Sequence, residues 1–286
     1  KAIVLKPDYT EAHNNLGVTL QELGRLEEAE ASLRQAIVLK PDCAVAQCNL
    51  GILLHVNEDI DAALEKFEKA TSIDPELEVP KLILSVLRAR KAKEKNKASI
   101  SRPIESSSSS GLTTNPLVLT RKVEPGLIST LSEVIPQELD QTLGPRYGNG
   151  RCSSDKLFHG DNSVIEILAN DLTNVMKLAV KSEIYILESF LNIYGAGAGV
   201  NPHNHENKID KEMSLNLGKQ KYSLAYYLSV GDQDCSDPGF LKLYDPEEKI
   251  LPAEGMIVIF PASRIHSAVY GGKTDRVMVG VNFYSL

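Results

Sequence analysis

The chain has 286 residues, of which 42% are hydrophobic and 24% are charged, and its formal net charge at pH 7 is −7. That composition is typical of an ordinary soluble protein with about two domains. The acidic balance argues against a nucleic acid as the main partner, because phosphate binding needs a basic surface. No apolar run approaches the roughly 20 residues that cross a bilayer, so no membrane partner is expected.

The four cysteines are scattered along the chain without C-x-x-C spacing: Cys43, Cys48, Cys152 and Cys235. This arrangement indicates reduced thiols and no structural zinc site, with a single disulfide as the open alternative. The chain begins with helix-like sequence and shows no secretory leader. Together these features predict a cytoplasmic location.

A set of residues recurs at a spacing of 34 in the first part of the chain. The set is a leucine–glycine pair, two alanines, a large apolar residue and a proline: Leu16, Gly17, Ala29, Leu33, Ala36 and Pro41, then Leu50, Gly51, Ala63, Phe67, Ala70 and Pro75. The glycines let two helices approach closely, the alanines fill tight contacts, and each proline ends a helix. The spacing and the residues resemble the tetratricopeptide repeat, a pair of antiparallel helices.

This resemblance implies an all-α repeat array over residues 1–97. We expect two complete repeats, at about residues 10–43 and 44–77, and a capping helix at residues 78–97 with a basic end. The basic end is most simply a solvated helix terminus. Stacked repeats form a concave groove. A protein or peptide partner is therefore expected in that groove, although no residue identifies it.

Residues 98–116 differ in composition from both neighbouring segments. They contain five consecutive serines at positions 106–110, then Gly111, and few apolar residues. Such a segment cannot bury a core. We therefore predict a flexible linker here, between the repeats and a second domain at residues 117–286.

In the second domain the periodicity changes, and from Glu183 onward the pattern is that of strands. Two helices are predicted, at residues 127–135 and 163–181. Strands separated by Gly and Pro turn signals follow at residues 184–194, 222–230, 239–244, 255–260, 265–270 and 276–284. Short antiparallel strands after helices predict a jelly-roll sandwich or barrel with the helices on one face. The mouth of such a barrel is a common place for a ligand site.

Three of the chain's six histidines lie in this domain at positions that suit a metal ion. His203 and His205 are separated by one residue, and His266 follows Phe260-Pro261 at a short distance. Residues at i and i+2 point the same way when the backbone is extended. A His-x-His pair on one strand face, joined by a distant histidine, could supply three imidazole ligands. The alternative is three surface histidines without a metal.

The order of motifs around these histidines is specific. It runs through Pro202-His203-Asn204-His205, Tyr222–Leu228, Leu243-Tyr244-Asp245-Pro246, Pro252–Pro261, His266, Arg276 and Asn282-Phe283. This order resembles the 2-oxoglutarate/Fe(II)-dependent oxygenases, a double-stranded β-helix family that is sometimes attached to tetratricopeptide repeats. The resemblance covers residues 184–286. Its most specific part is Gly-x5-Pro-x4-His, with an arginine ten residues beyond the histidine.

The resemblance implies a metal and a co-substrate. It implies Fe(II) held by His203, His205 and His266, and 2-oxoglutarate that chelates the metal through its keto-acid end. The far carboxylate of 2-oxoglutarate then needs a cation. Arg276 suits this role, because a guanidinium meets a carboxylate with two parallel hydrogen bonds. A structural salt bridge inside the barrel is the alternative for Arg276.

Three further residues are expected in the co-substrate site: Tyr194, Tyr227 and Asn282. The two tyrosines would donate hydrogen bonds to 2-oxoglutarate, and either one could instead belong to the core. Asn282 shares one face of the last strand with Arg276, whereas the valines between them and Phe283 share the other face.

The histidine motif departs from the wider superfamily at one ligand. Relatives there commonly carry His-x-Asp or His-x-Glu, but neither His203 nor His205 is followed by a carboxylate at that spacing. The narrower family shows Pro-His-x-His, which favours a ligand set of three histidines. Glu206 or Asp210, in the polar segment that follows, is the alternative third ligand.

These features predict an Fe(II)- and 2-oxoglutarate-dependent dioxygenase, a hydroxylase whose repeats recruit a protein or peptide substrate or partner. No catalytic residue is expected beyond the metal ligands. Two alternatives stay open. One is a repeat scaffold whose barrel is degenerate and not catalytic. The other is a three-histidine dioxygenase that does not use 2-oxoglutarate, in which Arg276 is structural.

Overall fold

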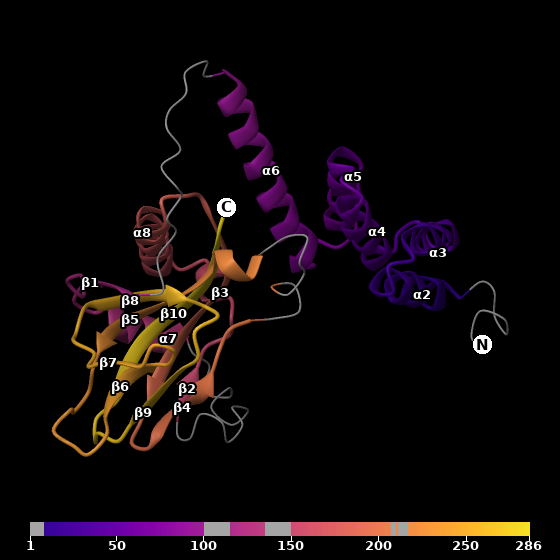
Figure 1. Cartoon of the computed structure of the whole chain (residues 1–286). Helices are drawn as coiled ribbons and strands as arrows, with labels where there is room; N and C mark the ends of the chain where they lie inside the picture. Colours follow the sequence, from indigo (N-terminus) through magenta and orange to yellow (C-terminus); the bar gives the residue numbers. More distant parts are fainter. Residues whose placement is uncertain (1–8, 100–114, 135–149, 207–209, 211–216) are drawn as a thin grey trace. The chain divides into compact units, whose positions relative to one another are not determined.

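The structure is a computed structural model, and it describes residues 9–99, 115–134, 150–206, 210 and 217–286 (Figure 1). The chain divides into two compact units, residues 1–104 and 105–286, which we call the repeat unit and the barrel unit. Within the described ranges, no helix is long and apolar enough to cross a membrane. All four cysteines carry free thiols.

The described part of the repeat unit contains helices α2 (Thr10–Glu22), α3 (Leu26–Leu39), α4 (Ala44–Val56), α5 (Ile60–Ile73) and α6 (Glu78–Ser99). α2 packs against α3, α4 packs against α5, and α6 packs against α5. These are the two helix pairs and the capping helix that the repeat spacing predicted, so the all-α array is confirmed. α6 continues two residues past its predicted end. The rest of the predicted linker, from residue 100 to residue 114, lies outside the described residues.

Close packing between paired helices explains the recurring glycines and alanines. A Cβ atom at Gly17 would lie 2.5 Å from Cγ of Leu33, and one at Gly51 would lie 2.8 Å from Cε1 of Phe67. The recurring alanines are fully buried: Ala29, Ala36, Ala63 and Ala70. α3 and α5 each end two residues before a recurring proline, as expected for a residue that cannot continue a helix.

The barrel unit is built on two antiparallel sheets, with strand orders β1-β8-β5-β10-β3-β2 and β4-β9-β6-β7. The strands are β1 (Leu117–Thr120), β2 (Arg151–Cys152), β3 (Ile184–Tyr194), β4 (Ala198–His203), β5 (Lys221–Ser229), β6 (Pro238–Leu243), β7 (Glu248–Ile250), β8 (Met256–Pro261), β9 (His266–Tyr270) and β10 (Arg276–Ser285). From β3 onward the chain passes back and forth between the two sheets. That is the double-stranded β-helix, or jelly roll, and the predicted fold class is confirmed.

Two helices, α7 (Leu127–Val134) and α8 (Ser163–Val180), cover the outer face of the six-stranded sheet (Figure 1). Leu172 and Met176 of α8 are fully buried in this layer. The same core contains alternate residues of β10: Val277, Val279, Val281 and Phe283. The alternation predicted for this strand is therefore present, and the opposite face of β10 turns toward the space between the two sheets.

Each of the six predicted strands occurs within one residue of its expected bounds, and each pairs with neighbours on both sides. The strands that were not predicted are β1, β2 and β7, and β4 was predicted only around its histidine. All four lie at sheet edges. An edge strand pairs on one side only and packs against fewer neighbours, so its sequence needs less β-branching and less regular alternation.

Candidate metal centre

Two of the predicted ligands face each other on neighbouring strands. His203 ends β4, His266 begins β9, and the antiparallel register pairs them directly. Their ring centroids lie 4.3 Å apart. Nδ1 of each ring hydrogen-bonds to the backbone carbonyl two residues earlier, at 2.8 Å to Asn201 for His203 and at 3.2 Å to Arg264 for His266. A proton on Nδ1 satisfies these bonds and leaves Nε2 available to bind a metal.

The third predicted ligand, His205, lies beyond the strand. β4 ends at His203, so the His-x-His pair does not share one strand face, and that expectation was wrong. The backbone N–H of His205 donates to the carbonyl of Ala262 at 3.0 Å. This bond ties His205 to the turn before His266. Its ring centroid lies 4.9 Å from that of His203 and 5.0 Å from that of His266.

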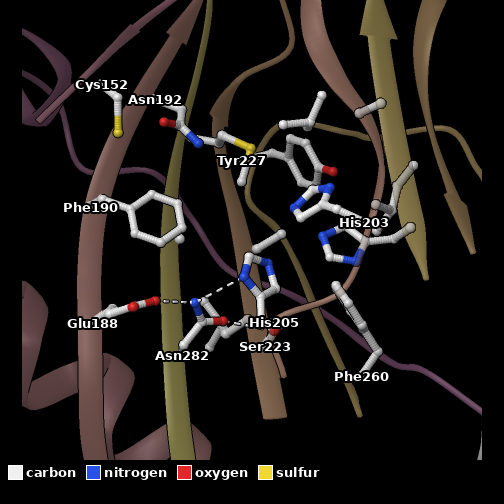
Figure 2. Close-up of a pocket in the computed structure, with 18 of the residues that line it drawn as sticks. Cys152, Glu188, Phe190, Asn192, His203, His205, Ser223, Tyr227, Phe260 and Asn282 are labelled. Carbon is white, nitrogen blue, oxygen red and sulfur yellow. Dashed lines mark hydrogen bonds between the residues drawn. The ribbon is translucent and has the colours of Figure 1, made fainter. Parts of the chain in front are cut away.

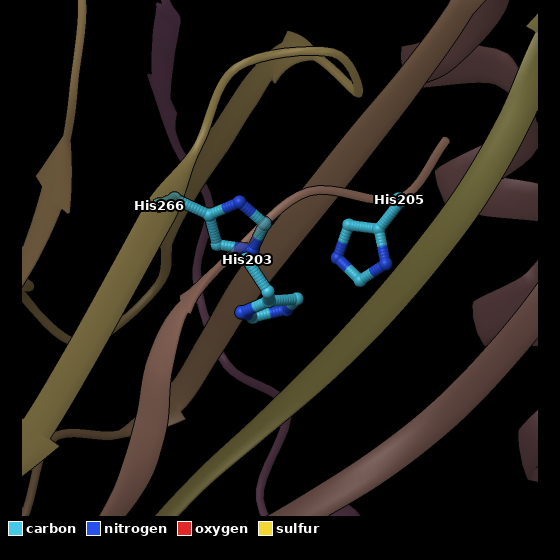
Figure 3. Close-up of side chains that lie close together, drawn as sticks. All are labelled: His203, His205 and His266. Atoms are coloured by element: carbon cyan, nitrogen blue, oxygen red, sulfur yellow. The ribbon is translucent and has the colours of Figure 1, made fainter. Parts of the chain in front are cut away.

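The three histidines form a group that could hold one metal ion (Figure 3). Their candidate ligand nitrogens all lie within 4.8 Å of one another. Two nitrogens bound to one ion at about 2.1 Å are at most about 4.2 Å apart, so small side-chain rotations would complete the set. In the part of the chain that the structure describes, no other group of three or more His, Cys, Asp or Glu residues is close enough together to hold a metal ion.

The protein holds two of these imidazoles in the form that binds metals. Burial, together with the charges of the other two histidines and of Lys221, lowers the pKa of His205 to about 3. Burial also lowers the pKa of His266 to about 4, helped by the charge of His203 and opposed by the hydrogen bond to Arg264. Both rings are therefore neutral at pH 7, as metal coordination requires.

The ring of His205 is supported by a chain of polar side chains (Figure 2). Nδ1 of His205 lies 3.3 Å from Nδ2 of Asn282. Asn282 also donates to the carboxylate of Glu188 at 2.6 Å and accepts from the hydroxyl of Ser223 at 2.7 Å. Nδ2 of Asn282 carries two N–H donors, so one can donate to Glu188 and the other to Nδ1 of His205, which accepts in this arrangement.

Neither alternative carboxylate belongs to the histidine group. Asp210 forms a buried ion pair with Lys221 at 2.8 Å and accepts a hydrogen bond from the hydroxyl of Tyr284 at 2.7 Å. Glu206 is exposed and accepts a hydrogen bond from Asn204 at 3.4 Å. Of the candidates that the sequence offered, the structure brings together the three histidines and not these two carboxylates.

A cavity of about 300 Å³ lies beside the histidines, between the two sheets (Figure 2). The predicted Tyr194, Tyr227 and Asn282 line it together with the three histidines. Burial raises the pKa of Tyr227 to about 12, and the charge of Arg276 opposes that shift. The Tyr227 hydroxyl therefore stays protonated and can donate a hydrogen bond to a ligand. The Tyr194 hydroxyl accepts a hydrogen bond from Asn192 at 3.0 Å.

The predicted anchor, Arg276, is not among the described residues that line this cavity. It is 2% exposed, and its guanidinium donates to the carbonyls of Val230 at 3.2 Å, Gly239 at 2.6 Å and Pro238 at 2.5 Å. It also lies 4.4 Å from the centroid of the Tyr270 ring. A Cβ atom at Gly239, where φ is 79°, would lie 1.8 Å from Nη1, so glycine is needed there. No lysine or arginine lines the described part of the cavity.

Several polar cavity residues on β2, β3 and β5 were not predicted from the sequence, among them Cys152, Glu188, Asn192 and Ser223. A signal for part of this set was present in β3. Glu188 and Asn192 alternate there with the core residues Leu191 and Ile193. Polar residues on the inward face of a strand that otherwise packs in the core are unusual, and they mark this face as the wall of a site.

Three comparisons relate the chain to known proteins. Residues 8–76 match the family model of the tetratricopeptide repeat, which confirms the repeat prediction. No curated protein matches the chain.

Solved structures similar to the chain include an oxidoreductase of the 2OG-Fe(II) oxygenase family from Burkholderia pseudomallei, with 14% identity, a TM-score of 0.44, and 59% of this chain and 85% of that chain covered. A prolyl-4-hydroxylase from Pseudomonas putida has 16% identity and a TM-score of 0.42, with 61% and 94% covered. A prolyl hydroxylase from Trichoplax adhaerens, in complex with a peptide fragment of the hypoxia inducible factor oxygen degradation domain, has 14% identity and a TM-score of 0.44, with 60% and 84% covered.

Proposed function

We propose that the barrel unit is an Fe(II)-dependent dioxygenase that uses 2-oxoglutarate as co-substrate and hydroxylates a protein or peptide. The observation that carries the proposal is the convergence of His203, His205 and His266 beside a cavity between the sheets of a jelly roll. Non-haem iron oxygenases hold the metal by three side chains and leave other positions open. Bound iron would supply the activation of oxygen.

The donor set fits iron(II) and an anionic co-substrate. Imidazole nitrogen is a suitable ligand for iron, and His205 and His266 are held neutral by their lowered pKa values. Three neutral ligands leave both positive charges of the ion uncompensated, whereas the usual set includes a carboxylate. A dianion that chelates the metal, such as 2-oxoglutarate, would balance that charge.

The chain's own residues would bind and orient the co-substrate. Tyr227 and Tyr194 line the cavity and would make hydrogen bonds to the co-substrate through their hydroxyl groups, and Asn282 holds the ring of His205. The guanidinium carbon of Arg276 lies 6.0 Å from the centroid of the Tyr227 ring. To bind the far carboxylate, this guanidinium must turn from the backbone carbonyl of Gly239 toward the cavity.

We assign the repeats a recruiting role. The repeat unit has the helix pairs of a tetratricopeptide array, and repeat arrays of this kind offer extended concave surfaces to partners. A tether between a binding module and a catalytic module raises the local concentration of a bound substrate. The repeats would thus select the protein or peptide that the barrel modifies.

The test is an anaerobic titration of the full chain with Fe(II) and 2-oxoglutarate, followed by the visible charge-transfer absorption of the chelate. We expect the band to appear with the wild-type chain and to vanish in His266→Ala. We expect Arg276→Ala to keep iron but to weaken 2-oxoglutarate binding. A chain that binds no iron would overturn the proposal and leave the barrel as a non-catalytic scaffold. The repeats would then be used as bait to isolate binding partners.

A second candidate, a three-histidine dioxygenase that does not use 2-oxoglutarate, is favoured by the surroundings of Arg276. Its guanidinium donates to three backbone carbonyls, and the described cavity lining contains no lysine or arginine. Iron binding without the charge-transfer band, together with an Arg276→Ala variant that behaves as wild type toward 2-oxoglutarate, would select this candidate.

A further inference from the structure

His205 is the predicted ligand that no strand holds, and a closed ring of hydrogen bonds holds its backbone instead. The N–H of His205 donates to the carbonyl of Ala262 at 3.0 Å, and the N–H of Ala262 donates to the carbonyl of Lys221 at 2.9 Å. The ring closes where Nζ of Lys221 donates to the carbonyl of His205 at 2.5 Å. Because Lys221 begins β5 and Ala262 follows β8, the ring fixes His205 against two strands of the larger sheet.

The same ammonium group is half of a buried ion pair. Nζ of Lys221 lies 2.8 Å from Oδ2 of Asp210, and the two side chains are 2% and 0% exposed. The hydroxyl of Tyr284 donates to the other carboxylate oxygen at 2.7 Å. Gly218 packs so closely on Asp210 that a Cβ atom there would lie 2.9 Å from the Asp210 carbonyl oxygen. The ammonium and the carboxylate are thus held in place from several sides.

A buried ion pair is a weak source of stability, because removing two charges from water offsets most of their attraction. Its better-supported use is to specify one conformation. Here the conformation specified is that of the segment carrying His205, because Lys221 bonds to Asp210 and to the His205 carbonyl with one ammonium group. His203 and His266 need no such support, since strand pairing places them.

We infer that Lys221 and Asp210 are positioning residues for the metal centre. They hold the backbone of His205 so that its imidazole meets those of His203 and His266, and neither of them binds the metal. Asp210 acts through Lys221, by keeping the ammonium aimed at the His205 carbonyl. This inference rests on the proposed metal centre.

The test compares the Co(II) affinity of full-length variants by visible absorption, with Co(II) alone as the probe. The double variant Lys221→Met/Asp210→Asn removes both charges together, so no unpaired charge is left buried, and it keeps an acceptor for Tyr284. We expect its Kd for Co(II) to rise about 10- to 100-fold, the effect typical of losing an outer hydrogen-bond partner of a metal ligand. Lys221→Arg retains a charged donor, so its Kd for Co(II) should lie between those of the wild-type chain and the double variant.

Leu172→Ala is the matched control, because Leu172 is fully buried in the helical layer of the same unit and is not among the described residues that line the cavity beside the histidines. It should lower the unfolding midpoint of the barrel unit and leave the Kd for Co(II) unchanged at a temperature where every variant is folded by tyrosine fluorescence. A double variant with the wild-type Kd, or a Leu172→Ala variant that weakens binding equally, would overturn the positioning role alone. A wild-type chain that binds no Co(II) would overturn the metal centre as well.

Discussion

The repeat unit and the barrel unit bury different kinds of side chain. In the described residues of the repeat unit, the buried polar side chains are the amides Asn14 and Gln47, and none is charged. The described part of the barrel unit buries an arginine on its last strand, a lysine–aspartate pair and a metal-ligand candidate: Arg276, Lys221, Asp210 and His266. Buried charges require specific partners, which apolar packing does not.

The buried side chains of the two units therefore have different kinds of partner. In the described repeat unit most buried side chains are apolar and pack between neighbouring helices. In the barrel unit the buried charged groups have partners on other segments, as Arg276 has at the start of β6. The two units also have separate optical reporters. The chain lacks tryptophan, and nine of its ten tyrosines lie in the barrel unit, whereas most of its helix is in the repeat unit.

The largest expected effect is on the metal centre. Replacing His266 by alanine removes one of three ligands, and we expect binding of Co(II) or Fe(II) to be lost. The rise in Kd should exceed the factor of about 10 to 100 that is typical of losing an outer hydrogen-bond partner of a ligand. The measurement is metal titration by absorption, with circular dichroism at 222 nm as the control for the repeat helices. His159→Ala is the matched variant, since His159 is exposed and outside the histidine group. Retained binding in His266→Ala would assign the metal elsewhere.

The next effect concerns the core of the repeat unit. Phe67 is fully buried against Gly51, so Phe67→Ala leaves a cavity and should lower the free energy of unfolding of this unit by about 3–5 kcal/mol. Urea unfolding followed at 222 nm should show an earlier transition, while the transition seen by tyrosine fluorescence and the Kd for Co(II) stay unchanged. An equal shift in the tyrosine transition would show that the two units unfold as one.

A smaller effect should follow acidification of the metal-free protein. The pKa values of His205 and His266 are lowered to about 3 and about 4 in the folded state, against about 6.5 in an unfolded chain. Below about pH 6.5 the unfolded state binds protons that the folded state does not, so the free energy of unfolding of the barrel falls as the pH drops toward about 4. Tyrosine-detected unfolding at pH 7 and pH 5 measures this.

The control for the acid effect is the double variant His205→Gln/His266→Gln, which lacks both titrating rings. It should lose much of the difference in barrel stability between pH 7 and pH 5. A wild-type barrel that is equally stable at both values would contradict the prediction.

The smallest effects are expected at two helix caps, one in each unit. The side chain of Asp59 accepts a hydrogen bond from the N–H of Ala62 at 3.1 Å, and that of Asn162 accepts one from the N–H of Val164 at 2.9 Å. Replacing either cap by alanine should lower stability by about 1 kcal/mol. Asp59→Ala should move only the transition at 222 nm, and Asn162→Ala only the transition seen by tyrosine fluorescence. A cap variant that moved both would couple the units.

The amino-acid sequence was sufficient to predict the helices and strands whose residue pattern is contained within the element itself. The 34-residue recurrence predicted the helix pairs, because the packing of Gly51 on Phe67 repeats that of Gly17 on Leu33. Enrichment in β-branched and aromatic residues between turn signals predicted the six strands that pair on both sides. It failed at the sheet edges, where one neighbour is missing and the pattern is weaker. The three histidines were also identified from their residue type and order.

Only the tertiary structure decided how those residues are held. Periodicity describes neighbours along one element and contains no information about partners that are distant along the chain. His205 leaves the strand and is held by Lys221 and Ala262, Asp210 is taken up by the buried ion pair, and Arg276 meets the backbone around Gly239. Each of these outcomes depends on two or more segments meeting in space. For that reason the sequence could name the groups of this site but not their partners.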